Sequence, residues 1–210
     1  LYGVDAASGT ERWRVDLHHP ISAPVLRLGE RLVAMAEDGT VATVDAAGRE
    51  AWRRRPLRSH GSSLAVSEDL VLVGGDDGGV VALDPTSGRQ LWNWRGGTGI
   101  TGLVASADTV VVSRFDGAVS ALEPIDGGER WTVTLSDWLR APAVVDDSTA
   151  YVANPSGSVV ALDLATGGEV WRAQVSAPHA LSLWRDRLVV GSASAGVAVV
   201  LDLSTGDEVW

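Results

Sequence analysis

Short apolar runs separated by polar turns recur along the whole chain. The segment 21–55 shows the pattern clearly: its apolar runs are 23–28, 31–36 and 40–44, with a fourth run around Trp52. Asp38 and Gly39, between the second and third runs, form a tight hairpin signal. The segment is therefore predicted to form four short antiparallel strands.

Six of the nine tryptophans each mark the end of one such segment. They are Trp13, Trp52, Trp92, Trp131, Trp171 and Trp210, and the intervals between them are 39, 40, 39, 40 and 39 residues. A repeat of about 40 residues that contains four strands is typical of one blade of a β-propeller. We therefore predict an all-β β-propeller built from four-stranded antiparallel blades.

The residues before each tryptophan also repeat. A glycine stands four residues earlier, at Gly9, Gly48, Gly88, Gly127, Gly167 and Gly206, and an acid precedes it, at Asp5, Asp45, Asp84, Glu123, Asp163 and Asp202. We call the segment from the acid to the residue after the glycine the docking turn. The glycine fits a positive φ or a close backbone approach, and the acid can accept N–H groups of the turn. We predict that each tryptophan seals one blade against its neighbour, with its indole N–H bound to a carbonyl.

The full pattern, A-x-D-x-x-[TS]-G-x-x-x-W, is matched best by residues 82–92 and 161–171 and adequately by 3–13. It resembles the tryptophan-docking motif of the pyrroloquinoline-quinone (PQQ) repeat propellers. That superfamily includes the quinoprotein alcohol dehydrogenases and the BamB-like outer-membrane assembly lipoproteins. The resemblance covers essentially the whole chain. Glu123 and Asp126 replace the usual Asp and Thr, Val200 replaces Ala, and the second repeat is one residue short before Gly48.

The resemblance implies a single PQQ-like propeller domain over residues 1–210. By its register, the chain begins in the third strand of a blade and ends in a fourth strand at Trp210. Propellers of this family usually have about seven or eight blades, so we expect a segment of about five to six blades from a longer propeller. A compact six-bladed ring with one thin blade is the alternative.

Charge and composition exclude several classes of partner and site. The chain has 17 arginines, no lysine and 27 carboxylates, with a net charge of −10, whereas nucleic-acid binding needs clustered basic residues. Cysteine is absent, which excludes disulfides and thiolate metal sites. No apolar run approaches the roughly 20 residues that span a bilayer, so no transmembrane segment is predicted in this chain.

The enzymatic members of the superfamily bind PQQ with a metal ion. The resemblance implies that they carry a vicinal cysteine pair, an Asn and a Glu among the metal ligands, and a catalytic Asp. This chain has no cysteine, and its only asparagines are Asn93 and Asn154. The glycine-rich segment 74–79 lies between two apolar runs and is interpreted as a hairpin rather than a calcium loop. We therefore predict no cofactor and no metal site.

The loops that join the last strand of one blade to the first strand of the next are the candidate binding surface. We call them the inter-blade loops; they are about 17–21, 56–61, 96–100, 136–141 and 176–179. They hold all four histidines together with arginines and a tryptophan, and the candidate residues are His18, His19, Arg58, His60, Trp138, Arg140 and His179. Loops on a rigid scaffold often carry function, and Trp and Arg often anchor interfaces. The alternative is that loops simply collect polar residues and that Trp138 packs against a blade edge.

Other residues are interpreted as structural. Arg53, Arg54 and Arg55 are predicted to form a solvated outer edge. Trp94 and Trp184, outside the 40-residue register, are predicted to be packing residues.

The sequence therefore favours a non-catalytic propeller that acts as an interaction scaffold or ligand sensor. The resemblance points to BamB-like proteins and to PQQ-repeat domains attached to bacterial kinases. It also favours an extracytoplasmic or membrane-associated location. The expected partner is a protein or a small ligand on the propeller rim. The alternative is a degenerate or partial PQQ-dependent alcohol or sugar dehydrogenase.

Overall fold

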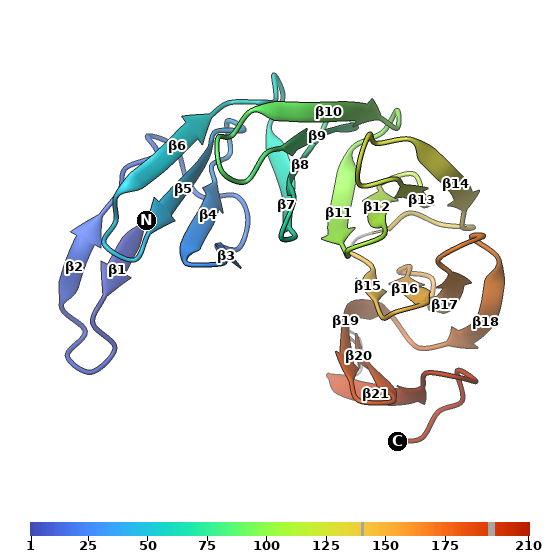
Figure 1. Ribbon diagram of the computed structural model, residues 1–210. Coiled ribbons are helices and arrows are strands. Elements are labelled where there is room, and N and C mark those ends of the chain that lie inside the picture. Colours follow the sequence, from blue (N-terminus) through green and yellow to red (C-terminus); the bar gives the residue numbers. More distant parts are fainter. Residues whose placement is uncertain (140, 193–195) are drawn as a thin grey trace. The chain divides into compact units, whose positions relative to one another are not determined.

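The computed structural model describes residues 1–139, 141–192 and 196–210. Their strands pair into antiparallel sheets whose order follows the sequence, as Figure 1 shows. Four of these sheets have four strands, so the prediction of an all-β chain built from four-stranded antiparallel blades is confirmed. The chain divides into two compact units, unit 1 (Leu1–Ile100) and unit 2 (Thr101–Trp210), which we describe separately. Within the described ranges, no helix has the length and apolar character needed to cross a membrane.

Unit 1 contains a two-stranded sheet and two blades. The sheet is β1 (Tyr2–Val4) and β2 (Glu11–Arg14); the blades are β3 (Leu26–Leu28), β4 (Arg31–Met35), β5 (Val41–Asp45) and β6 (Glu50–Arg54), then β7 (Gly61–Val66), β8 (Val71–Gly75), β9 (Gly79–Leu83) and β10 (Gln90–Arg95). The middle strands β8 and β9 are buried at every residue, which explains their unbroken apolar sequence. Met35, Val73 and Val81 belong to the core that joins the two blades.

Unit 2 contains two blades and a three-stranded sheet. The blades are β11 (Ile100–Ala105), β12 (Val110–Arg114), β13 (Ala118–Leu122) and β14 (Glu129–Thr134), then β15 (Val144–Val145), β16 (Thr149–Ala153), β17 (Ser158–Asp163) and β18 (Glu169–Gln174); the sheet is β19 (Pro178–Trp184), β20 (Arg187–Ser192) and β21 (Val197–Asp202). Tyr151, Trp171 and Leu188 share one core cluster between the last blade and this sheet.

Strand β3 is shorter than the predicted run 23–28. Its ladder with β4 begins at the pair Leu26–Val33. Pro24 has no N–H to donate, and proline interrupts a ladder for that reason. Before β3, the chain meets the end of β4 at the isolated bridge between Ile21 and Ala36, and the N–H of Ser22 donates to Met35 O at 3.0 Å.

Tryptophans join neighbouring sheets within each unit. The indole N–H donates to a carbonyl of the next docking turn in the pairs Trp13–Ala46, Trp52–Pro85, Trp131–Leu164 and Trp171–Leu203, at 2.8–2.9 Å. The ring lies against the turn's glycine: a Cβ at Gly88 would stand 2.6 Å from the Trp52 ring. Gly88 also has φ of 67°, so this position favours glycine for two reasons. Each docked indole therefore fixes one blade against the next.

Carboxylates hold the docking turns. Oδ1 of Asp84 accepts the N–H of Thr86, at 3.2 Å, and both the N–H and the hydroxyl of Ser87, at 2.7 and 2.6 Å. Glu123 differs from the prediction, because its carboxylate pairs with Arg130, with Nε and Oε1 2.6 Å apart. The longer glutamate side chain carries the carboxylate past the turn's N–H groups. Asp126 accepts the N–H of Gly128 in its place, at 2.8 Å.

These turns make stability sensitive to acid. Hydrogen bonds from the backbone N–H and hydroxyl groups of the turns lower the pKa of the docking-turn acids Asp5, Asp45, Asp84, Asp163 and Asp202. A folded-state pKa below the unfolded value gives stability that is fully present above about pH 4 and is lost as pH falls through the folded pKa. We expect the urea midpoint to be steady between about pH 7 and 5 and to fall below about pH 4.

A urea midpoint that rises on acidification would have a different physical cause, so the measurement distinguishes the two effects. The net charge of −10 produces repulsion that acidification relieves. A urea midpoint that rises steadily from neutral pH to about pH 3 would show that this relief outweighs the hydrogen-bonded turns.

The predicted fourth strand at Trp210 is present only as its first pairings with β21. Residues 203–210 meet β21 at the isolated bridge between Leu201 and Glu208 and by hydrogen bonds to Val200. Trp210 is 77% exposed.

Arg54 and Arg55 are exposed, as the interpretation of a solvated edge expects, and Arg53 is half-buried, but all three arginines also make hydrogen bonds. Arg53 Nη2 donates to Asp16 O at 2.9 Å, Arg54 Nη2 to Ser87 O at 3.1 Å, and Arg55 Nε to Asp38 O at 2.8 Å. These carbonyls belong to the preceding sheet's loop, to the next docking turn and to the hairpin of the same blade. Arg53 and Arg54 therefore link neighbouring sheets of unit 1, and Arg55 links the outer strand to the hairpin of its own blade.

Trp184 is another correction, because it is 59% exposed instead of packed. It lies at the end of β19, where the guanidinium of Arg185 stacks 4.9 Å from the ring centroid. Trp94 is half-buried on the outer strand β10.

Candidate functional site

Three inter-blade loops, those that contain Ser59, Thr98 and Asp137, close over the hairpin that joins the second and third strands of the preceding blade. In unit 2, Leu135 N–H donates to Gly117 O at 3.0 Å. The hairpin glycine lies under a loop carbonyl in the pairs Gly39–Ser59, Gly78–Thr98 and Gly117–Asp137, where a Cβ would stand 3.1, 2.5 and 2.3 Å from the carbonyl oxygen. We call the surface formed by these loops and hairpins the loop face, and each unit has its own.

These contacts define equivalent positions in the repeat. Ser59, Thr98 and Asp137 each place a carbonyl over a hairpin glycine. The residues that follow them, His60, Gly99 and Trp138, are therefore equivalent. Two of the candidate residues, His60 and Trp138, thus occupy the same place in different repeats.

The loop face of unit 1 brings histidines close to hairpin carboxylates. His19 Nε2 lies 3.6 Å from Asp38 Oδ2, and His60 Nδ1 lies 3.4 Å from Asp76 Oδ2. The two imidazoles are 52% and 79% exposed, so both are accessible to a partner.

The hairpin carboxylate of Asp38 is held by several donors. Burial raises its pKa, but the N–H and hydroxyl of Thr40 outweigh burial, and the pKa stays below its ordinary value. Arg55 Nε lies 3.6 Å from its Oδ2. Asp77 is held in the same way by Ser59 and Arg95, at 2.9 and 2.7 Å. The loop face of unit 1 therefore carries carboxylates that are held in fixed positions beside arginines.

His18 and Arg58 lie at the surface of the same face. His18 has a left-handed backbone, with φ of 65°, and its N–H donates to Asp16 Oδ1 at 2.7 Å. Its side chain is 73% exposed. Arg58 is exposed in the loop between β6 and β7. A non-glycine residue with positive φ is uncommon and often occurs at functional loops.

The loop face of unit 2 carries an aromatic pair. The ring centroids of Trp138 and Phe115 lie 5.3 Å apart, with an angle of 32° between the planes. Phe115 is 57% exposed and Trp138 is half-buried. His179 is exposed on β19, with its imidazole beside Gly191 of β20. Arg140 lies outside the described residues.

Sequence reasoning missed Phe115. It is the only phenylalanine of the chain and stands at the tip of the hairpin between β12 and β13. The hairpin glycines are Gly39, Gly78, Gly117 and Gly157, and the residues two positions before them are Glu37, Asp76, Phe115 and Pro155. Two other blades hold a carboxylate at the position of Phe115. An alignment of the repeats therefore reveals this apolar ring as a signal of a functional residue.

The residues present do not fit a PQQ and metal site. Asn93 is exposed on β10, and its Oδ1 accepts a hydrogen bond from Gln90 at 3.3 Å. Asn154 is buried, and its Oδ1 accepts the hydroxyl of Ser156 and the N–H of Ser158, at 2.8 and 3.0 Å. Across residues 1–139, 141–192 and 196–210, no group of three or more His, Cys, Asp or Glu is arranged to hold a metal ion.

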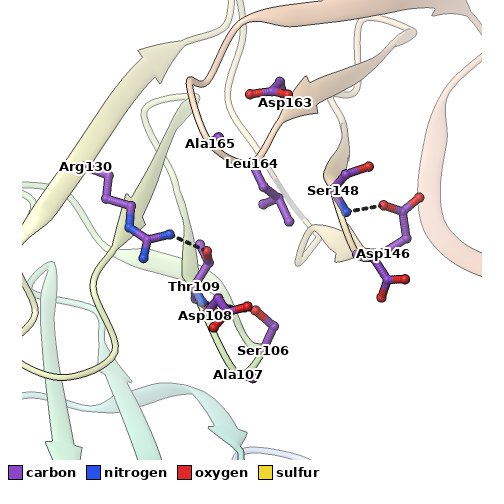
Figure 2. A pocket seen from close by; sticks show the side chains of 11 residues that line it. Ser106, Ala107, Asp108, Thr109, Arg130, Asp146, Ser148, Asp163, Leu164 and Ala165 are labelled. Atoms are coloured by element: carbon purple, nitrogen blue, oxygen red, sulfur yellow. Dashed lines mark hydrogen bonds between the residues drawn. The ribbon is translucent and has the colours of Figure 1, made fainter.

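A pocket of about 500 Å³ lies on the other side of unit 2, beside a docking turn (Figure 2). Its walls are the β11–β12 turn, the β15–β16 turn and the docking turn after β17. The lining residues are Ser106, Ala107, Asp108, Thr109, Arg130, Asp146, Asp147, Ser148, Asp163, Leu164 and Ala165.

Most polar groups of this pocket already bind protein atoms. Arg130 pairs with Glu123 and donates to Thr109 Oγ1 at 2.8 Å. Asp146 accepts the N–H of Ser148 and the hydroxyl of Tyr151, at 2.9 and 2.7 Å. Burial, together with this bond to Asp146, raises the pKa of Tyr151 to about 12. The pocket's side chains therefore serve first to hold the turns.

An equivalent pocket of about 390 Å³ occurs in unit 1. It is lined by the turn between β3 and β4, by Glu68 and by Pro85 and Thr86 of the next docking turn. Because the two pockets occupy the same place in the repeat, we interpret them as products of blade geometry. The loop faces, whose side chains differ between blades, are the better candidate site.

Comparison with known protein families identifies the family of this chain. The matching family model is described as outer membrane protein assembly factor BamB, and its two matches cover residues 1–116 and 115–210. The chain belongs to the BamB family. A comparison with curated proteins gave no significant match.

Three solved structures are similar to the chain in backbone. BamB from Moraxella catarrhalis is 23% identical with a TM-score of 0.82, and the match covers 96% of this chain and 67% of that one. The computationally designed Ika8 protein is 22% identical with a TM-score of 0.89, covering 97% and 65%. The designed Ika4 protein is 21% identical with a TM-score of 0.70, covering 74% and 99%. The chain thus spans about two thirds of the first two structures, and the PQQ-like propeller fold is shown.

Proposed function

We propose that this BamB-family chain is a non-catalytic scaffold that binds a protein partner through its loop faces. The observation that carries the proposal is the contrast within each loop. Its backbone is fixed against a hairpin glycine, while the side chain that follows, His60 in one blade and Trp138 in another, is exposed or half-buried. Rigid loops with variable side chains are suited to recognition.

The family supports a protein as the partner. Its description is that of an outer membrane protein assembly factor, which is a function carried out on other proteins. The chain's own charge of −10 argues against nucleic acid. His18, His19, Arg58, His60, Trp138, Arg140 and His179 are the residues proposed to contribute to binding.

The test uses photo-crosslinking in the organism that produces the chain. A photoreactive phenylalanine analogue at position 58 or 138 is expected to give a covalent adduct with one defined protein. The same analogue at Arg27 or Ile125 serves as the control, because both side chains are exposed, at 74% and 86%, and lie away from the inter-blade loops. Adducts of equal yield from all four positions would overturn the proposal.

Alanine variants give the matching affinity measurement. With the crosslinked protein purified, we expect Arg58→Ala, Trp138→Ala and Arg140→Ala together to weaken binding by about tenfold or more. The melting temperature should change little, because Arg58 is exposed and Trp138 is half-buried. Unchanged affinity with a large drop in melting temperature would instead identify these as packing residues.

The dehydrogenase alternative has a direct test. Titration with PQQ and calcium should leave tryptophan fluorescence unchanged apart from inner-filter effects, because the residues present do not form the site. Stoichiometric binding together with dye-linked alcohol oxidation would overturn the non-catalytic proposal.

A further inference from the structure

We propose that Phe115 and Trp138 form the anchor site of the unit 2 loop face, and that its ligand is a protein segment carrying a large apolar side chain next to basic residues. The inference rests on the proposed function and adds the chemistry of the partner. Four features of the described residues support it: the position of Phe115, the rigidity of the pair, the charges beside it and the net charge of the chain.

The repeat does not require an aromatic residue at position 115. The equivalent hairpin tips hold Glu37, Asp76 and Pro155, and their blades have the same four strands. Phe115 nevertheless leaves 57% of its surface exposed. Trp138 replaces His60 and Gly99 at the facing loop position. Two aromatic substitutions therefore meet at one point of the surface, 5.3 Å apart.

The pair is rigidly held. The carbonyl of Asp137 lies so close to Gly117 that a Cβ there would be 2.3 Å from its oxygen, and Leu135 N–H donates to Gly117 O. Leu139, directly after Trp138, is fully buried. An aromatic residue whose backbone is held in place before binding loses less conformational entropy when it binds, which is how such residues act as anchors.

Carboxylates flank both rings. Asp116 follows Phe115, and Asp137 precedes Trp138. The Asp116 side chain is 39% exposed, with Arg114 Nε 3.4 Å away. An apolar centre with negative charges at its rim complements an apolar side chain with positive neighbours.

The net charge of the chain favours the same partner over a second copy of itself. Two chains of charge −10 repel each other, whereas a basic segment is attracted over a distance of about a Debye length, roughly 8 Å at physiological salt. The proposed ligand is therefore a basic, apolar segment of another protein.

The test pans a phage-displayed library of random dodecapeptides against the immobilised full chain. We expect the enriched peptides to combine Trp, Phe, Leu or Met with adjacent Arg or Lys. A synthetic peptide of the enriched sequence should lose about tenfold or more in affinity for Phe115→Ala or Trp138→Ala in fluorescence anisotropy. Asp116→Asn should weaken binding less and reduce its salt dependence.

Ile125→Ala is the matched control, because Ile125 is an apolar side chain, 86% exposed, in a docking turn. It should bind like the unmodified chain. Phe115→Ala should keep the melting temperature of the unmodified chain, so that a loss of affinity cannot be attributed to unfolding. Phe115→Tyr, which keeps the aromatic ring, should retain most of the binding.

The remaining outcomes separate this inference from the proposed function. Enrichment of acidic peptides, or affinity that is unchanged in Phe115→Ala, overturns the anchor site. If the affinity of the enriched peptides depends on Arg58 or His60 in either of these cases, the proposed scaffold function stands and only the anchor site is wrong. Both proposals fail if substitutions in the two loop faces change neither the affinity for peptides nor the yield of a crosslinked partner.

Discussion

Replacing Trp171 by alanine is expected to lower the free energy of unfolding by about 3–5 kcal/mol, the range for large aromatic residues truncated in a core. Trp171 is 8% exposed, packs with Tyr151 at 5.7 Å between ring centroids, and donates its indole N–H to Leu203 O at 2.8 Å. Its removal would leave a cavity between the β15–β18 blade and the β19–β21 sheet and would also free the Leu203 carbonyl. Urea unfolding followed by circular dichroism measures the loss.

Trp184→Ala is the matched control in the same unit. Trp184 is also a tryptophan, but it is 59% exposed and contacts the guanidinium of Arg185. Its removal should cost about 1 kcal/mol or less. Trp171→Phe should lie between the two, because it keeps a ring but loses the hydrogen bond. Equal losses for Trp171→Ala and Trp184→Ala would show that docking does not hold these sheets together.

The second large effect is expected from Gly88→Ala in unit 1. A Cβ at Gly88 would stand 2.6 Å from the Trp52 ring and 3.0 Å from Arg54 Cγ, and φ is 67°. Alanine therefore strains the backbone and also displaces a docked indole. The expected loss of unfolding free energy is about 2–4 kcal/mol.

Gly29→Ala separates these two causes. Gly29 has φ of 57°, but a Cβ there would have no neighbour within 4 Å. The variant should show the backbone term alone, about 1 kcal/mol. If Gly88→Ala costs no more than Gly29→Ala, the indole moves aside without loss and the docking contact is weak. A difference in tryptophan fluorescence between folded Gly88→Ala and the folded unmodified chain would report such a movement.

The blade architecture could be predicted from the sequence because its determinants are local. A hairpin such as Asp38–Gly39 selects its turn within a few residues, and the apolar runs around it reflect burial on both faces. The shortening of β3 was also readable from Pro24, although the apolar run 23–28 concealed it. The 40-residue tryptophan register then indicated how these local units repeat.

Features that depend on tertiary neighbours were not predictable in the same way. The side chains of Arg53, Arg54 and Arg55 look like a charged edge in sequence, but their carbonyl partners lie in other segments. Trp210 carries the docking signature, yet it is 77% exposed. Glu123 has the same charge as the aspartates of the other docking turns but a longer side chain. Because of that length, its carboxylate pairs with Arg130.

The candidate site shows the same division. The inter-blade loops were located from the strand pattern, and His60 and Trp138 were selected from them by residue type. Their equivalence became visible only when Gly78 and Gly117 were seen under Thr98 and Asp137. Phe115 was missed because it lies in a hairpin, and nothing in a hairpin sequence tells which loop will fold over it.

The hydrogen bond between a docked indole and the next docking turn affects which parts of a blade can vary. Trp52 reaches a carbonyl 33 residues ahead, and Trp131 does the same, so each bond joins a blade only to its immediate successor. The docking turns lie at the opposite end of the strands from the inter-blade loops. A loop can therefore be lengthened, exchanged or randomised without disturbing the bond between blades. A BamB-family blade is in this sense an interchangeable module, and grafting the 135–139 loop together with the 114–117 hairpin into another repeat should transfer its binding preference.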